Sequence, residues 1–440
     1  MPRAGCCRRP TTTTQPTQPG PAPEPDRLPD IARALRLAAR RFGTPVYVTD
    51  VLALDAAADR IERAFPDPWI RQYSVKANDV AAIVARLAVR GWGANVVSRG
   101  EWAVSTRAGL SNDRVTLEGI GKTDADLRAA VRAAIDGRPL RWVAVESVDE
   151  VALLGRLAAR HRTTLEVLLR LNPDVTPETH AGLSVGLGGS KFGMTETEIG
   201  EAIESAGGGR GPLRLRGLQV HVGSQLGAID AWRDAARRAI ALLALLRGSL
   251  PDFDTVDLGG GFPVAPLGQP SPMAEHFARE VPGILDAIPV DRRPARMAIE
   301  PGRALVARAG WIVARVLHVR DRGGRQIVLD AGMTELIRPA LYGGRHGVVA
   351  LTSQGGPSDG GAELETATVH GPICESTDEL GEHALPALRR GDLVAIRDAG
   401  AYAASQSSTY NGRPRPPQVL MEPDGRLVVV RRRGTLASLG

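Results

Sequence analysis

Between Arg71 and Glu300 the sequence alternates eight short apolar segments with segments of helical periodicity, and this alternation is the strongest constraint on its fold. One helical segment spans 230–247 and is followed by Gly248, and another is expected after Asp79, its predicted N-cap. The expected strands are 72–75, 94–97, 114–117, 142–145, 165–171, 217–222, 255–258 and 296–299. Eight such units predict an α/β fold in the form of a (β/α)8 barrel, with a doubly wound parallel sheet as the alternative.

After about Leu305 the pattern changes to short apolar runs separated by Gly, Pro and Asp, which is typical of a mostly β domain. These runs are 311–319, 326–329, 365–369, 393–396, 418–421 and 427–430, and 45–48 could join them. We therefore expect a disordered Pro- and Thr-rich leader at 1–30, an N-terminal segment at 31–70 that contributes to the β domain, the barrel at 71–305 and the β-rich domain at 306–440. Because no linker-like stretch separates the two halves, they should pack together.

The charge pattern argues against nucleic-acid binding and favours an anionic small molecule. The net charge is +6, arginines and acids are interleaved, and the one dense basic run is the short stretch 431–433. Three cysteines cannot build a disulfide framework, so a reducing cytoplasm is expected. The leader has no apolar core like that of a secretory signal, and the longest apolar stretch, 239–246, is too short to span a membrane.

Lysine is scarce in this chain, since Lys76, Lys122 and Lys191 are the three lysines among 55 basic residues. Arginine can replace lysine as a surface charge, but it stays protonated and cannot form an imine with an aldehyde. Lys76 follows the first predicted barrel strand and Lys122 follows the third, while Lys191 lies in a Gly-rich loop. Position alone therefore leaves both Lys76 and Lys122 as candidates for imine chemistry.

Polar residues gather at the carboxyl ends of the predicted strands, where barrel enzymes place their active sites. They are Lys76, Ser98, Asn172, His221, Ser224, Gly259, Gly260, Gly261, Glu300 and Arg303. Singly, the glycines could form a tight turn, Glu300 and Arg303 a surface ion pair, and His221 a core histidine. Together they supply a lysine, amides and a guanidinium for a phosphate, an imidazole and a carboxylate, which predicts a pyridoxal phosphate site without a metal.

Ordered motifs make the chain resemble the fold-type III pyridoxal phosphate decarboxylases, and among them the diaminopimelate decarboxylases, from about Phe42 to Val430. The motifs are FGTPVYV at 42–48, YSVKAN at 73–78, VVSRGE at 96–101, KFG at 191–193, HVGSQ at 221–225, DLGGGFP at 257–263, EPGR at 300–303, IRPALYG at 337–343, GPICESTD at 371–378 and DAGAYAASQSSTYNGRPRP at 398–416. The resemblance implies an alanine racemase-like barrel with a β-rich C-terminal domain.

The resemblance also implies a role for each matching residue. Lys76 would bond to the cofactor's aldehyde, His221 would stack on its ring and Glu300 would face the ring nitrogen. The phosphate end would meet Ser224, the glycines 259–261 and Arg303, with Tyr402 beside the cofactor. Cys374 would protonate the product, Arg303, Arg338 and Tyr342 would hold a distal carboxylate, and Glu375 would meet a distal ammonium. In the family the cysteine loop comes from a partner subunit, which implies a homodimer with shared sites.

Departures from the family pattern bear on the substrate rather than the reaction. Gln219 replaces a frequent histidine, Asn95 replaces a common aspartate, and the stretch 183–186 lacks a frequent hydroxyl. The sequence CES at 374–376 and Arg338 favour meso-diaminopimelate, because a distal carboxylate needs a fixed cationic fork. The alternatives are decarboxylation of ornithine, arginine, D-lysine or a carboxy-polyamine, a racemase, and a non-catalytic pyridoxal phosphate-binding homologue.

Overall fold

The computed structural model describes residues 27–265, 269, 271–351 and 363–439. The disorder expected for the leader falls largely on residues outside these ranges. Residues 28–30, however, were expected to belong to that leader and instead form the first turn of helix α1 (Leu28–Phe42). The reason is local, because Leu28, Ile31 and Leu35 share one buried face of this helix and anchor its start.

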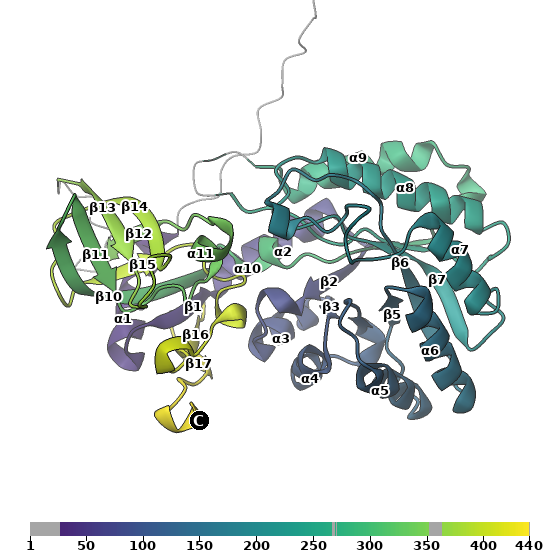
Figure 1. Ribbon diagram of the computed structural model, residues 1–440, viewed down its shortest axis with the longest axis horizontal. Helices are drawn as coiled ribbons and strands as arrows, with labels where there is room; N and C mark the ends of the chain where they lie inside the picture. The colour runs from purple at the N-terminus through teal and green to yellow at the C-terminus, as the bar shows by residue number, and fades with distance from the viewer. Residues whose placement is uncertain (1–26, 266–268, 270, 352–362, 440) are drawn as a thin grey trace, which may run out of the picture.

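Residues 70–299 form a closed barrel of eight parallel strands, which confirms the barrel and excludes the doubly wound sheet (Figure 1). The circle closes where β2 pairs with β9, with Ile70 opposite Ala298. The strands are β2 (Ile70–Ser74), β3 (Gly93–Val96), β4 (Val115–Leu117), β5 (Trp142–Val145), β6 (Leu165–Leu171), β7 (Leu213–Val220), β8 (Thr255–Asp257) and β9 (Arg296–Ile299). Each matches an expected strand, because strands covered on both faces are recognisable as apolar runs.

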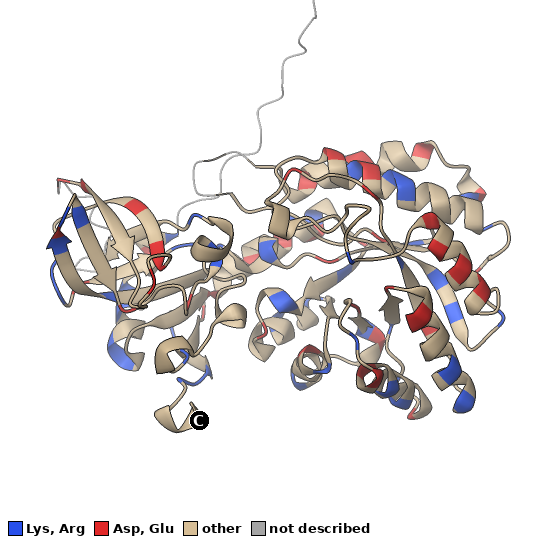
Figure 2. Cartoon of the chain, in the orientation of Figure 1, with Lys and Arg blue, Asp and Glu red and all other residues tan. Residues whose placement is uncertain are grey.

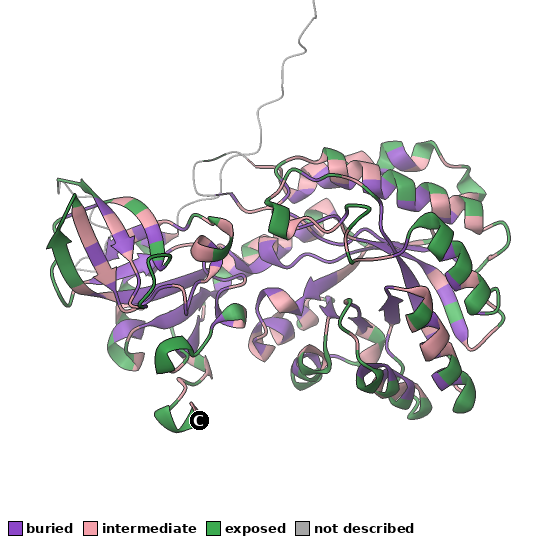
Figure 3. Ribbon diagram, viewed as in Figure 1, coloured by how far each residue is buried: buried purple, intermediate pink, exposed green. Residues whose placement is uncertain are grey.

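Helices surround the barrel, and Figure 3 shows buried strands inside a layer of helices with exposed outer faces. They are α3 (Ala81–Val89), α4 (Arg99–Arg107), α5 (Asp124–Ile135), α6 (Val148–Arg160), α7 (Glu196–Ser205), α8 (Asp230–Leu246), α9 (Ala274–Asp286) and the short α10 (Arg303–Val306). The expectation that Asp79 caps α3 was wrong. Residues 75–77 form a 3₁₀ turn, Val80 becomes the N-cap, and Asp79 instead pairs with Arg431 at 3.0 Å.

The second domain is a nine-stranded sheet beside the barrel, as Figure 1 shows. Its strands are β1 (Val46–Asp50), β10 (Gly310–Asp321), β11 (Arg325–Leu329), β12 (Val348–Leu351), β13 (Glu365–His370), β14 (Glu379–Leu385), β15 (Leu393–Ile396), β16 (Gln418–Met421) and β17 (Leu427–Arg431). Strand β1 lies between β10 and β16, so the segment before the barrel does enter this sheet. The expected strands omitted β12 and β14.

The segment 31–70 divides between the two hydrophobic cores. Helix α1 packs on β1 and β10, whereas helix α2 (Val51–Ala64) buries Val51, Leu54 and Ile61 in the barrel core. The domains meet closely near the barrel mouth, where the Tyr402 N–H donates to the Ala77 carbonyl at 2.8 Å.

Figure 2 shows basic and acidic residues interspersed over the outer helices. No helix among the described residues is long and apolar enough to cross a membrane.

Candidate active site

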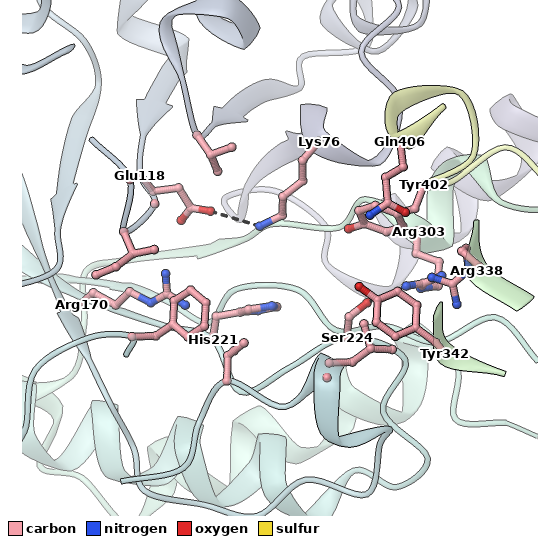
Figure 4. A pocket seen from close by; sticks show the side chains of 18 residues that line it. Lys76, Glu118, Arg170, His221, Ser224, Arg303, Arg338, Tyr342, Tyr402 and Gln406 are labelled. Carbon is pink, nitrogen blue, oxygen red and sulfur yellow. Dashed lines mark hydrogen bonds and ion pairs between the residues drawn. The ribbon is translucent and has the colours of Figure 1, made fainter. Parts of the chain in front are cut away.

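A cavity of about 420 Å³ opens at the carboxyl ends of the barrel strands and is closed on one side by the second domain (Figure 4). Barrel side chains meet α11 (Arg338–Tyr342) and the Tyr402 segment across it. Its polar lining comprises Lys76, Glu118, Arg170, His221, Ser224, Arg303, Arg338, Tyr342, Tyr402 and Gln406. The fold therefore brings together seven of the predicted residues that are far apart in sequence: Lys76, His221, Ser224, Arg303, Arg338, Tyr342 and Tyr402.

Lys76 projects from the 3₁₀ turn that follows β2, and its side chain remains 35% exposed to the cavity. Its Nζ atom lies 3.6 Å from Oε1 of Glu118, and Figure 4 shows the two groups pointing toward each other. Burial acts to lower the pKa of Lys76, but the negative charge of Glu118 opposes this, and the pKa is raised overall. The amine is therefore held as an ammonium within the cavity.

The structure separates Lys76 from the other two lysines. The Lys122 side chain is 1% exposed, pairs with Glu150 at 3.0 Å and donates to the Gly119 carbonyl at 2.6 Å. The Lys191 ammonium lies 5.3 Å from the centre of the Phe192 ring. Neither residue lines the cavity. Lys122 thus belongs to a buried structural ion pair with Glu150, and Lys76 is the lysine that a ligand in this cavity can reach.

His221 follows β7 and is held as a neutral imidazole. Burial, reinforced by the positive charges of Lys76 and Arg170, lowers the pKa of His221 to about 3. The Gly260 N–H donates to its Nδ1 at 3.3 Å. At neutral pH His221 therefore offers a flat uncharged ring rather than a cation.

Glu118, Asp257 and Glu300 are buried carboxylates inside the barrel at this end. Gln219 donates to Oε2 of Glu300 at 3.3 Å. Burial, with the charges of Asp257 and Glu118, raises the pKa of Glu300 well above its ordinary value. Burial likewise raises the pKa of Asp257 to about 7. Burial therefore favours the neutral form of the Glu300 carboxyl.

The glycines after β8 sit against backbone with no room for a side chain. A Cβ at Gly259 would lie 2.5 Å from the Val220 carbonyl oxygen, and one at Gly260 would lie 2.5 Å from that of Glu300. A small pocket of about 20 Å³ adjoins them, lined in part by Ser224, Gly261, Gly302, Arg303 and Tyr402. Bare amides, a hydroxyl and a guanidinium around one hollow are the donors that a phosphate requires.

Arg303 joins this pocket to the main cavity. Its Nη2 donates to the Ser224 hydroxyl at 2.9 Å, and its guanidinium lies 4.8 Å from the Tyr402 ring centre. Burial, together with the positive charge of Arg338, lowers the pKa of Arg303 to about 10. Its Nε atom is buried without a hydrogen-bond partner. Two crowded guanidinium groups form a cationic end of the cavity that can receive an anion.

Arg338 and Tyr342 are one helical turn apart on α11, with the guanidinium 5.7 Å from the ring centre. Burial lowers the pKa of Arg338. Cys374 and Glu375 are not brought to the cavity, since both are exposed in the loop between β13 and β14. There, the Tyr410 hydroxyl donates to Oε1 of Glu375 at 2.7 Å.

Two residues of the predicted set are structural, because Ser98 caps α4 and Asn172 donates to the carbonyls of Leu187 and Phe192. The sequence reasoning also missed two charged residues that line the cavity, Glu118 and Arg170. Both carried a usable signal, since Glu118 directly follows β4 and Arg170 interrupts the apolar run of β6. Among the described residues no group of His, Cys, Asp and Glu side chains is arranged to hold a metal ion.

Comparison with known proteins decides the family. Residues 53–307 match the family described as pyridoxal-dependent decarboxylase, pyridoxal binding domain. The chain belongs to this family. It is thus a pyridoxal phosphate-dependent decarboxylase. The lysine, the uncharged imidazole and the hydroxyl and guanidinium donors of the small pocket fit that cofactor.

Curated relatives span nearly the whole chain. The chain is 37% identical to diaminopimelate decarboxylase of Deinococcus radiodurans, over 88% of this chain and 92% of that protein. It is 35% identical to diaminopimelate decarboxylase of Neisseria meningitidis serogroup A, over 90% of this chain and 94% of that protein. The similarity therefore extends through the second domain as well as the barrel.

Solved structures share the same two-domain fold. The crystal structure of diaminopimelate decarboxylase from M. jannaschii in complex with L-lysine superposes with a TM-score of 0.83 at 30% identity, over 92% of this chain and 93% of that one. The Helicobacter pylori enzyme complexed with L-lysine gives 0.82 at 28% identity, over 92% of this chain and 98% of that one. These matches confirm the alanine racemase-like fold.

Proposed function

We propose that this decarboxylase converts meso-2,6-diaminopimelate to L-lysine and carbon dioxide. The observation that carries the proposal is one cavity with Lys76 at one end and two buried guanidinium groups, Arg303 and Arg338, at the other. A diaminopimelate molecule has a carboxylate at each end, so one carboxylate can bind the two guanidinium groups while the other is released as carbon dioxide. The names of the relatives and the bound L-lysine in two of the matched crystal structures support this substrate.

The cofactor would be held by the residues that the cavity and the small pocket bring together. Lys76 would bond to its aldehyde, and His221 would lie against its ring. Ser224, Gly259, Gly260, Gly261, Arg303 and Tyr402 would surround its phosphate. When bound, pyridoxal phosphate accepts the electron pair released as the bond between Cα and the carboxylate breaks. These assignments agree with the bare amides and the buried donors of the small pocket.

Two side chains prepare the charge balance of the reaction. The neutral His221 adds no positive charge next to the cofactor's ring. It therefore does not compete with Lys76 for the negative charge of Glu118. Glu300 has a buried carboxyl whose pKa is raised by burial, and this carboxyl would meet the ring nitrogen. A proton shared there favours a positively charged ring, which draws electrons from the substrate more strongly.

After carbon dioxide leaves, Cα must gain a proton, and we propose that Cys374 supplies it from a second subunit. Within one chain Cys374 and Glu375 are exposed and lie outside the cavity lining, so they need a partner to reach a cavity. In a homodimer with shared sites, Glu375 would receive the distal ammonium of the substrate. Tyr410, which donates to Glu375, would hold that carboxylate in place.

The substrate is tested by measuring carbon dioxide release from meso-diaminopimelate, D- and L-lysine, ornithine and arginine at equal concentrations. We expect diaminopimelate to give the highest kcat/KM. Faster release from ornithine or arginine would assign the cationic end a different role. No release from any substrate, with a normal visible absorbance from bound cofactor, would favour a non-catalytic homologue.

The shared site is tested by mixing two inactive variants, Lys76→Ala and Cys374→Ala, after dissociation and reassociation. If each site takes its lysine from one subunit and its cysteine from the other, a mixed dimer has one intact site, and an equal mixture recovers about a quarter of the activity. No recovery in a mixture shown to exchange subunits would place both residues in one chain. We also propose a cytoplasmic location, consistent with a cysteine-poor chain.

A further inference from the structure

We propose that Glu118 is the positioning residue for Lys76, and that its buried carboxylate keeps the Nζ atom positively charged and directed into the cavity. This inference rests on the proposed function, because the charge matters through the bond that Lys76 forms with the cofactor. Glu118 lies at the end of β4 and is 3% exposed. Its Oε1 atom is 3.6 Å from the Nζ atom of Lys76.

Glu118 is ionised even though it is buried. Burial alone would raise its pKa, but the positive charges of Lys76 and Arg170, together with hydrogen bonds to Glu300 and Asn95, outweigh this and lower the pKa to about 2. Arg170 is already paired with Glu146 at 2.5 Å, so its charge is largely compensated elsewhere. A buried carboxylate needs a nearby cation, and Lys76 is the group that supplies it.

The other groups that face Lys76 cannot take this place. Burial raises the pKa of Glu300 and so disfavours its charged form, and Glu101 accepts a hydrogen bond from the Val97 N–H at 2.9 Å. The amide of Asn95, on the neighbouring strand, is uncharged. The titratable and charged groups around Lys76 are Glu101, Glu118, Glu300, Tyr402, Arg170 and His221. Of the acids in this set, Glu118 is the one that is both ionised and paired with Nζ.

The consequence is chemical. If Lys76 bonds to the cofactor's aldehyde, a positive charge on its nitrogen would make that bond more reactive toward the amine of the substrate. A carboxylate 3.6 Å away favours that charge, as it favours the ammonium of the free lysine. Glu118 would therefore set the pH above which Lys76 loses its charge, both before and after it bonds to the cofactor.

The scarcity of lysine makes a direct measurement possible. Reductive methylation of cofactor-free protein with ¹³C-formaldehyde labels the lysine amines, and at most three lysine resonances need assignment, by single Lys→Arg variants. We expect Glu118→Gln to lower the pKa of Lys76 by about one to three units, as for loss of an opposite charge within 4–6 Å. Glu118→Asp, which keeps the charge, should restore part of the shift.

The chain offers a matched control in its second buried lysine–glutamate pair. Glu150→Gln removes the partner of Lys122 outside the cavity, and should leave the Lys76 resonance unchanged. In the holoenzyme, Glu118→Gln should also move the pH midpoint of the visible absorbance band to lower pH. A Lys76 resonance that titrates alike in Glu118→Gln and wild type overturns the inference, even if decarboxylation is confirmed. Because the resonance is read without cofactor, failure of the proposed function would show separately, as loss of binding or turnover in the wild type.

Discussion

Replacing Arg338 tests the cationic end of the cavity most directly. Its guanidinium is buried, faces the cavity and stands beside Arg303, so both can contact one carboxylate. Losing one hydrogen bond to a charged group costs about 2–3 kcal/mol, which corresponds to about a 30- to 150-fold fall in kcat/KM. We expect a fall of this size, and not a complete loss of activity, because Arg303 would still contact the distal carboxylate. The loss of Arg338 also removes a cause that lowers the pKa of Arg303, so that residue stays charged.

The assay is carbon dioxide release from meso-diaminopimelate, with ornithine as a substrate that lacks the distal carboxylate. Arg338→Ala and Arg338→Met should lose the same factor with diaminopimelate, because both lack the charge while methionine fills more of the space. Arg338→Lys should lose less, since it keeps the charge without the fork. Ornithine turnover should change little in all three variants.

Arg322→Ala serves as the control, because it removes an exposed arginine of the same domain that lines neither the cavity nor the pockets beside it. Thermal unfolding checks that each variant is folded. Equal losses for diaminopimelate and ornithine would refute the reasoning, since a general loss would indicate damaged cofactor binding rather than a missing carboxylate contact. An unchanged kcat/KM for diaminopimelate would refute it as well.

Three further predictions follow from the same geometry. Lys76→Ala should abolish both the visible absorbance of bound cofactor and carbon dioxide release. Lys122→Ala should keep the absorbance but lower the free energy of unfolding by about 3 kcal/mol, because it leaves Glu150 without its buried cation. A Lys76→Ala protein with full turnover would contradict the assignment of the lysine. Cys374→Ala should leave the absorbance intact and slow product formation by about 10²- to 10⁴-fold, in stopped-flow or steady-state assays, since only a proton donor is lost. The pKa of Asp257 is raised to about 7 in the folded protein, whereas its ordinary value is 3.8. Between these values the folded protein keeps a proton that the unfolded chain releases. The free energy of unfolding therefore falls as pH rises from about 4 to 7. Asp257→Asn removes this dependence, and urea unfolding of cofactor-free protein should show the variant gaining on the wild type as pH rises through that range; a constant difference would contradict the raised pKa.

The barrel was predictable because its strands are covered on both faces and are therefore nearly continuous apolar runs. The expected runs 142–145, 165–171 and 296–299 match β5, β6 and β9 at both ends. Strand β14 escaped prediction because Glu379, Glu382 and His383 interrupt it, and only Leu380 and Leu385 of this strand are buried. Strand β12 is four residues long and is recognised in the structure by its pairing with β15.

The sequence by itself determined the order of these units and the chemical groups at the strand ends, including a lysine, a triple glycine and a Glu–Arg motif. Local spacing contains this information, because a parallel barrel brings all its carboxyl strand ends to one rim. Position along the chain left both Lys76 and Lys122 open, and the motif resemblance favoured Lys76. The tertiary structure adds the physical ground, since just one of the two lysines faces the cavity. It also decided that Glu118 is an ionised partner of Lys76 and that burial raises the pKa of Glu300. The physical reason is that a charge in a buried site depends on neighbours that the chain supplies from distant positions, here from β2, β4, β7 and β9 together.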